Sequence, residues 1–437
     1  MHAIFQWLTK HRLLLLSSAL LVAANANAEP GFFDVAGFAS FVYAKTLDGD
    51  EGTVQGISDE GSERDFNTLG IRLSTELDNK LSFTTQIVAE GEKDYQLEME
   101  WMFFSYNLLP NLTLSIGKTR VPLFTFSDYL DVGYAYQWIS PPYSVYGIPS
   151  FGSIDGAQLR YNFYLDDNWS SDLWLWAGRV DESVNELGGE TLVIDNAAGI
   201  AWSVERNWLT LRAVYFTGNV SGDISGALSS VDAVAGFNTL AASLTQSLYS
   251  ENDGGLQELI NSSLSGTVDL SSVMDDLLLE KDPGEFLGLG TFLDFDRYFF
   301  AAEITRVEVD YSVGVGLLDS YYLMGGVRFD NDWTLSLTYA KDDDDVRKEI
   351  LQNYDQQVAP FVGQLTAVDQ AIDAVRTGLQ QVMDSGQKAD GDTYTFTARW
   401  DWHPASAVKL EYINHTIKRP DGRHKPQAVR LALDLVF

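Results

Sequence analysis

The last nine residues of the chain, VRLALDLVF at positions 429–437, alternate between two kinds of side chain. Every odd position holds an apolar residue, ending with the aromatic Phe437, while Arg430 and Asp434 occupy even positions. Successive side chains of a β-strand point to opposite faces, so this stretch predicts a strand with one wholly apolar face and one mixed face. Two structures accommodate such a strand: the wall of a membrane β-barrel, or the buried edge of a soluble periplasmic sheet.

The same alternation recurs in runs of roughly ten residues, the length that crosses a bilayer when a strand is tilted. In 392–403, Tyr394, Phe396 and Trp400 share one face, opposite Thr395 and Arg399. Apolar residues outward and polar residues inward are typical of a membrane barrel with a wet lumen. The expected strands are 33–46, 64–77, 81–91, 96–107, 111–120, 153–165, 168–180, 192–205, 207–218, 286–295, 298–310, 320–329, 333–341, 392–403, 406–417 and 427–437.

About sixteen such strands predict an all-β fold, a transmembrane antiparallel β-barrel whose even strand count places both termini in the periplasm. The segment 286–295 has the weakest strand pattern, because its glycines also suit a loop; without it the even count would be fourteen. Short turns rich in Asn, Asp and Pro, such as 77–80 and 403–406, mark the periplasmic rim. The long connections then lie outside the cell.

Two segments, 219–285 and 342–391, carry helical periodicity instead. Between Val346 and Val382, apolar residues recur every three or four positions, which predicts amphipathic helices. Four aspartates at 342–345 precede this run and favour the positive end of a helix; the alternative, a calcium site, lacks the usual spaced oxygens. We expect both inserts to be extracellular helices that pack against each other or the rim and partly cover the pore mouth.

The composition excludes several functions. A formal net charge of −33 argues against nucleic-acid binding, and the absence of cysteine excludes thiolate catalysis and thiolate metal sites. Mean hydropathy is −0.09, and no apolar stretch reaches the length of a membrane helix, so a membrane protein of this composition must be a barrel. We expect the surplus acid in external loops, beside lipopolysaccharide and its divalent cations; general solubility explains its sign equally well.

The N-terminal residues are organised like an export signal. Basic residues up to Arg12 precede an apolar run from Leu13 to Ala24, and a small-x-small pattern follows at 26–28. This predicts a signal peptide over residues 1–28 and a mature barrel over 29–437. A membrane anchor is the alternative, although the apolar run is too short to span a bilayer as a helix.

Three features resemble Gram-negative outer-membrane porins of the general-diffusion type. GFASF at 37–41 is similar to the first porin strand, GKTRVPL at 117–123 is similar to the fifth strand and the start of loop three, and Phe437 is similar to the terminal assembly signal. The resemblance extends over 31–218 and 286–437. The sequence lacks the Pro-Glu-Phe-Gly type segment of enterobacterial porins and adds helical inserts, so pore size and selectivity do not carry over.

The resemblance implies a homotrimeric porin of the bacterial outer membrane, a water-filled channel for passive diffusion of small polar solutes and ions. Its loop three, here 121–152, would fold into the lumen as a constriction. Phe437 would be read by the barrel-assembly machinery, and outer-membrane lipid and lipopolysaccharide would surround the barrel. No cofactor is expected.

Charged residues on inward faces and in loop three are the candidate pore-lining groups. Opposed acids and bases create a transverse field that orients dipolar solutes, while ordinary wall lining that keeps the lumen wet is the alternative. The acids of loop three favour a cation-selective pore, and the inward arginines favour the opposite selectivity. The candidates are Arg72, Glu98, Glu100, Asp128, Asp131, Arg160, Arg212, Arg328, Arg399 and Arg430.

Two other classes of function stay under consideration. An outer-membrane enzyme needs a histidine beside a nucleophile or an acid, and no nucleophile motif lies near His403, His415 or His424. A receptor, adhesin or structural barrel would act through its external inserts. Single-channel conductance separates an open channel from a sealed barrel of this kind.

Overall fold

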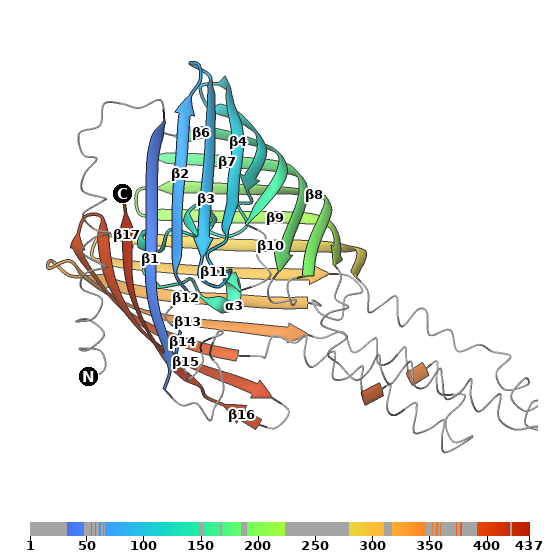
Figure 1. The fold of residues 1–437 in the computed structure, drawn as a ribbon, viewed down its shortest axis with the longest axis vertical. Helices are drawn as coiled ribbons and strands as arrows, with labels where there is room; N and C mark the ends of the chain where they lie inside the picture. Colours follow the sequence, from blue (N-terminus) through green and yellow to red (C-terminus); the bar gives the residue numbers. More distant parts are fainter. Residues whose placement is uncertain are drawn as a thin grey trace, which may run out of the picture.

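The computed structural model describes residues 33–47, 66–147, 152–166, 168–184, 190–222, 279–309, 317–345, 391–419 and 422–437, with isolated positions in 54–64 and 352–377. Its strands form one closed antiparallel barrel (Figure 1). Sixteen strands make the wall, and the three-residue β16 (Gly422–His424) pairs only with the end of β15. The wall strands are β1 (Asp34–Thr46), β2 (Thr68–Glu76), β3 (Leu81–Glu90), β4 (Leu97–Leu109), β5 (Leu112–Arg120), β6 (Ser153–Asp166), β7 (Trp169–Val184), β8 (Glu190–Arg206), β9 (Leu209–Gly222), β10 (Leu279–Phe295), β11 (Tyr298–Val309), β12 (Leu317–Arg328), β13 (Trp333–Asp345), β14 (Gly391–His403), β15 (Ser406–Arg419) and β17 (Gln427–Val436).

The barrel closes between its first and last strands. β1 pairs with β17 in a continuous antiparallel register and with β2 on its other side. Beyond the last ladder pair, the backbones of Gly37 and Phe437 exchange two hydrogen bonds of 2.7 and 2.9 Å. A Cβ at Gly37 would lie 2.3 Å from the Phe437 ring, so only glycine leaves room for the terminal aromatic side chain. The predicted C-terminal strand is therefore the strand that closes the barrel.

The outer wall exposes large apolar side chains at every second position. Leu69 and Ile71 on β2 are 46% and 44% exposed, and Leu337 on β13 is 55% exposed. Near the short-turn rim, Trp333 and Trp400 stack with ring centroids 5.8 Å apart. A band of exposed apolar residues edged by aromatic rings suits the hydrocarbon and interface of a bilayer, so the structure is a transmembrane barrel. No helix in the described part of the chain is long and apolar enough to cross a membrane.

The predicted strand order and count are confirmed, including the segment 286–295, which lies inside β10. Strands beside the inserts are longer than predicted, since β9 continues to Gly222 and β13 to Asp345. The aspartates 342–345 were expected to begin a helix; instead they pair with the first residues of β12, which satisfies their backbone groups. The predicted signal peptide 1–28 and most of both inserts lie outside the described residues and stay predictions.

Candidate functional site

The connection between β5 and β6, loop three, lies inside the barrel. It contains η3 (Ser127–Tyr129), η4 (Gly133–Ala135) and the one-turn α3 (Tyr143–Tyr146). α3 contacts β11, β12 and β13, whereas η4 contacts β1 and β17 (Figure 1). The loop therefore leaves the wall at β5 and reaches the opposite wall of the lumen.

Arg120, the last residue of β5, holds the root of loop three. Its guanidinium donates to the carbonyl of Ser127 at 2.7 Å and to the carboxylate of Asp131 at 3.1 Å. Glu100 on β4 lies 3.6 Å away, and Asp131 also accepts a 3.1 Å hydrogen bond from Gln86 on β3. Two carboxylates compensate the buried guanidinium, so this turn of the loop is held against β3–β5.

Glu303 on β11 joins the two arms of the loop. Its carboxylate accepts hydrogen bonds from the backbone N–H of Thr125 at 2.9 Å and the hydroxyl of Tyr146 at 2.7 Å. Between them, Phe124 packs on Tyr146 with centroids 4.6 Å apart and edge-on against Phe286 of β10 at 5.4 Å. A single wall carboxylate, surrounded by aromatic rings, thus fixes both arms.

Lys409 on β15 holds the far side of the loop. Its ammonium donates to the carbonyls of Gly133 at 2.5 Å and Trp138 at 2.6 Å, and it pairs with Asp434 on β17 at 2.9 Å. The lysine and the aspartate are both buried. A buried ammonium with all three protons directed at oxygen is fully compensated, which makes it a structural clamp.

Glu411, two residues further along β15, forms a second clamp. Its carboxylate accepts a 2.8 Å hydrogen bond from the backbone N–H of Ile139 and pairs with Arg430 at 2.6 Å. Arg430 in turn donates to the hydroxyl of Ser140. Arg399 on β14 donates to two further loop carbonyls, those of Tyr134 and Tyr136.

Residues of the first external loop, between β1 and β2, also contribute buried side chains to the interior of the barrel. Val54 and Ile57, which form an isolated bridge, are completely buried with Ala44, Ile413 and Ala428. Phe66 packs against this cluster and against a second one, which joins Val42 and Ala432 of the wall to Ile139 of loop three. We call the interior along β9–β17 and β1 the filled side, and the interior along β2–β8 the open side.

The open side keeps exposed charged groups. Arg160 on β6 retains 45% of its side-chain exposure, bonds Asp172 on β7 at 2.8 Å and lies over the ring of Trp174 with 4.3 Å to the centroid. Arg72 on β2 is exposed, and so is Asp128 of loop three. An acidic residue of loop three and two arginines of the wall therefore stay exposed inside the barrel.

Asp128 carries a perturbed acid group. The residue is exposed to the passage but enclosed by the barrel, and this desolvation raises the pKa of its carboxyl group; nearby Arg212 and Arg160 partly offset the rise. Burial likewise raises the pKa of the adjacent Tyr129 to about 12, so that hydroxyl stays neutral. The charge of this turn of loop three thus depends on the protonation of Asp128.

The ten predicted pore-lining residues separate into three groups. Two lie away from loop three: Glu98 pairs with Lys93 at 2.6 Å, and Arg328 pairs with Asp294 at 2.7 Å. Three stay exposed, namely Arg72, Asp128 and Arg160. Five hold loop three through ion pairs or hydrogen bonds, namely Glu100, Asp131, Arg212, Arg399 and Arg430.

Sequence reasoning missed the principal clamps, Lys409, Glu411, Asp434, Glu303 and Arg120. Strand parity alone points the first four inward, because their neighbours are outward apolar residues, as Leu410 is beside Lys409. Nothing in the sequence distinguishes a clamp from a passage residue. That distinction depends on where loop three lies.

The lumen wall is also less polar than the strand parity predicted. Inward Val180, Ile194, Phe216 and Val307 are buried in one apolar cluster that includes loop three residues such as Val145. A loop that packs inside a barrel needs apolar contact surface, because hydrogen bonds alone do not compensate its lost conformational entropy. Apolar packing therefore replaces a uniformly wet lumen around this cluster, which extends from the filled side onto β7 and β8 of the open side.

Comparison with known proteins identifies the fold. No protein-family profile matches the sequence, and no curated protein matches it. The outer-membrane channel DcaP of Acinetobacter baumannii superposes with a TM-score of 0.51 at 13% identity, covering 93% of this chain and 97% of that one. The Salmonella typhi OmpF complex with daunomycin superposes with a TM-score of 0.50 at 11% identity and the same coverage. The chain therefore has the closed-barrel fold of outer-membrane porins.

Proposed function

We propose that the protein is a porin of the bacterial outer membrane that lets small polar solutes and ions diffuse through an off-centre passage. The observation that carries this proposal is the unequal lumen: loop three packs against the filled side and its root against β3–β5, while the charged Arg72, Asp128 and Arg160 stay exposed inside the barrel. A barrel that served only as a scaffold gains nothing from keeping opposite charges, Asp128 and Arg160, exposed inside its lumen.

The charges along the passage favour cations weakly. Asp131 is compensated by Arg120, and Arg160 by Asp172. Asp128 is then the acid whose field acts on passing ions, with Arg72 opposing it. Small polar solutes with separated charges are the class that such a passage orients.

Planar-bilayer recording tests the proposal. The purified protein should give discrete conductance steps and a reversal potential of the cation-selective sign under a salt gradient. Asp128→Asn should lower the cation preference, whereas Arg179→Ala on the outer wall is the matched control and should change nothing. A barrel that inserts but never conducts contradicts the channel and favours a receptor, adhesin or structural barrel that acts through its external inserts.

We also propose the partners of such a porin: a homotrimer in outer-membrane lipid and lipopolysaccharide, assembled through Phe437 by the barrel-assembly machinery. No enzymatic role is part of this proposal. Native gels of unheated protein should show detergent-resistant oligomers that dissociate on heating. Cross-linking that yields only monomer contradicts the trimer without affecting the channel.

A further inference from the structure

The barrel closes at a junction between the two ends of the chain, the pairing of β1 with β17. Among the described wall strands, every other neighbouring pair is consecutive in the chain. The entropy cost of closing a loop grows with its length, and here the loop is the whole barrel. We call the ladder from the pair Phe38–Val436 to the pair Thr46–Ala428 the seam.

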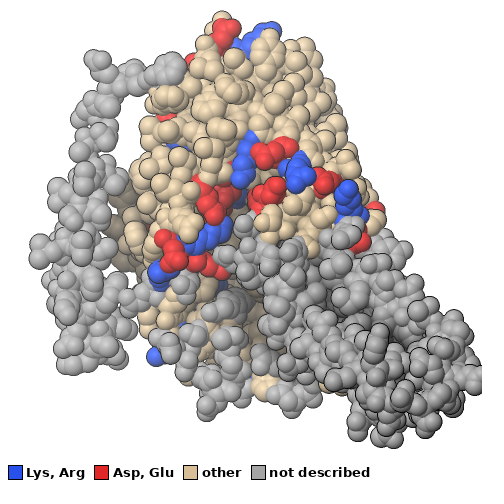
Figure 2. Space-filling model, turned by 45° about the vertical axis from the view of Figure 1, so that its right-hand side comes forward, with Lys and Arg blue, Asp and Glu red and all other residues tan. Residues whose placement is uncertain are grey.

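The outer face of the seam offers little besides its backbone ladder. It carries exposed aromatic and apolar side chains such as Tyr43 and Leu431. In the described part of the chain, no ion pair joins β1 to β17, because the ion pairs of β17 go to β15 instead. The junction of β7 with β8, by comparison, has Arg179 paired with Asp195 on the outer wall. Figure 2 shows charged side chains of both signs as a band across one face of that wall.

Three successive inward pairs of the seam are covered from inside the barrel. They are Ser40 with Asp434, Val42 with Ala432, and Ala44 with Arg430. All six side chains are buried, although inward side chains elsewhere, such as Arg72 on β2, stay exposed. The cover is provided mainly by loop three.

Loop three contacts these pairs in the order in which they follow along β1. Gly133 lies on the first pair, since a Cβ there would overlap the hydroxyl of Ser40 and lie 2.8 Å from a carboxylate oxygen of Asp434. Ile139 packs with both members of the second pair. The arginine of the third pair donates to the hydroxyl of Ser140 at 2.6 Å, and buried residues of the first external loop cover its alanine partner.

The same loop is attached on both sides of the seam. Arg120 at the end of β5 binds its root, where Asp131 also accepts a hydrogen bond from Gln86 on β3. Lys409 and Glu411 on β15 bind its far part. β3–β5 continue through β2 to β1, while β15 pairs with β17. Separating β1 from β17 moves the two attachments apart, so the buried ion pairs and hydrogen bonds of the loop oppose it.

We propose that loop three has a second role, as an internal lock that holds the seam of the barrel closed. A barrel open at this junction would expose the unpaired backbone of two strand edges, which lipid cannot satisfy. The lock acts from the lumen, where the charges that bind the loop are shielded from water. This role does not depend on which solutes pass through the barrel.

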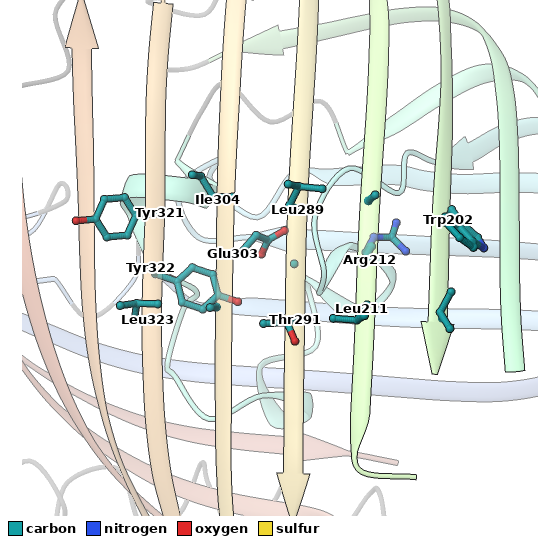
Figure 3. A pocket seen from close by; sticks show the side chains of 14 residues that line it. Trp202, Leu211, Arg212, Leu289, Thr291, Glu303, Ile304, Tyr321, Tyr322 and Leu323 are labelled. Atoms are coloured by element: carbon teal, nitrogen blue, oxygen red, sulfur yellow. The ribbon is translucent and has the colours of Figure 1, made fainter. Parts of the chain in front are cut away.

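Loop three also contacts the wall far from the seam, and this second contact supplies a matched control. On β10, a Cβ at Gly290 would overlap the hydroxyl of Thr125. Figure 3 shows Glu303, which binds this arm of the loop, with Arg212 and Tyr322 on the same part of the wall. Neither Gly133 nor Gly290 has a positive φ, so valine at either position displaces the loop without straining the backbone.

The test uses disulfides, which the chain lacks because it has no cysteine. Tyr43→Cys with Leu431→Cys links outward partners across the seam, and Tyr215→Cys with Leu287→Cys links the same residue types across β9–β10 as the control. Ladder partners lie within the Cα distance that a disulfide requires. The readout is the half-life of the folded full-length barrel in detergent at a fixed raised temperature, followed by gel mobility.

Gly133→Val should shorten this half-life about tenfold in the protein without a disulfide, the effect of an overpacked contact. The seam disulfide should abolish most of that loss, because the seam can then no longer open, whereas the β9–β10 disulfide should not. Gly290→Val should shorten the half-life by one common factor in all three backgrounds. Ile139→Ala removes apolar contact without adding volume, and it should behave like Gly133→Val even where the valine variant does not fold.

Three results would overturn the lock. The first is an unchanged half-life in both Gly133→Val and Ile139→Ala. The second is a loss in these variants that is equal with either disulfide, which would make loop three a source of general stability. The third is rescue of Gly290→Val by the seam disulfide, which would mean that contact at the seam itself is not what matters. Conductance is recorded in parallel, and a locked barrel that never conducts refutes the channel alone.

Discussion

Arg399 and Arg430, on the filled side of the lumen, are 7% and 3% exposed, whereas Arg160 on the open side keeps 45% of its side chain exposed. All three point inward by strand parity and look equivalent in the sequence. The guanidinium groups of Arg399 and Arg430 bind loop three, whereas that of Arg160 stays exposed inside the barrel; Arg120 on β5 binds loop three as well, at its root. An inward charged side chain in this barrel therefore either binds a loop or stays exposed in the lumen, and contact with the loop decides which.

The largest expected effect comes from breaking a clamp on the filled side. Glu411→Ala leaves Arg430 buried without its carboxylate, and the loss of one partner of a buried pair costs about 3–5 kcal/mol of unfolding free energy. It also releases the backbone of Ile139, so single-channel conductance should rise. Denaturant unfolding of the purified barrel measures the first effect.

The matched change on the open side is Asp172→Ala. Its pair with Arg160 is partly exposed, so the expected loss is about 0–1 kcal/mol. Equal destabilisation by the two variants would show that the sides do not differ as described.

A smaller loss of stability is expected from Glu303→Gln on β11, the wall residue that binds both arms of loop three. The carboxylate of Glu303 accepts hydrogen bonds from the Thr125 N–H and the Tyr146 hydroxyl, whereas the amide has only one acceptor oxygen and no charge. The unfolding free energy should therefore fall by about 1.5–3 kcal/mol. Calorimetric melting measures it, with Glu205→Gln on the open side as control. A larger shift in the control would reverse the assignment of Glu303 as a clamp.

Charge reversal on the open side should alter selectivity with little change in stability. Arg160→Glu adds negative charge beside the passage, so the reversal potential should move further toward the cation-selective limit, while stability changes by about 1 kcal/mol or less. Arg179→Glu on the outer wall should leave the reversal potential unchanged. An identical response from both variants would mean that Arg160 does not face the passage.

The smallest expected effect is a pH dependence of selectivity. Because the pKa of Asp128 is raised, its carboxylate takes up a proton at a higher pH than an ordinary aspartate. Cation preference should therefore fall as the pH is lowered through that raised pKa, and recover at neutral pH. In Asp128→Asn the reversal potential should be flat over the same range; a persistent slope would assign the titration to another group.

The strand order, the count of sixteen and the outward faces could be predicted from the sequence, since alternation with period two is a local property. The segment 286–295 was hardest because its glycines weaken the local pattern, and only pairing with β9 and β11 identifies it as part of β10. The prediction for the aspartates 342–345 is wrong for a similar reason: the helical periodicity that follows them favours a helix start, whereas pairing with β12 makes them the end of β13.

By itself, the sequence determined which side chains point into the barrel, because parity along each strand decides the face. Only the tertiary structure decided which of them hold a loop and which line a passage. Lys409 and Arg72 are both inward cations, yet the first is fully buried against loop carbonyls and the second is exposed. The reason is physical: loop three crosses the lumen and contacts strands distant in sequence, and the desolvation and compensation of a charge depend on those contacts.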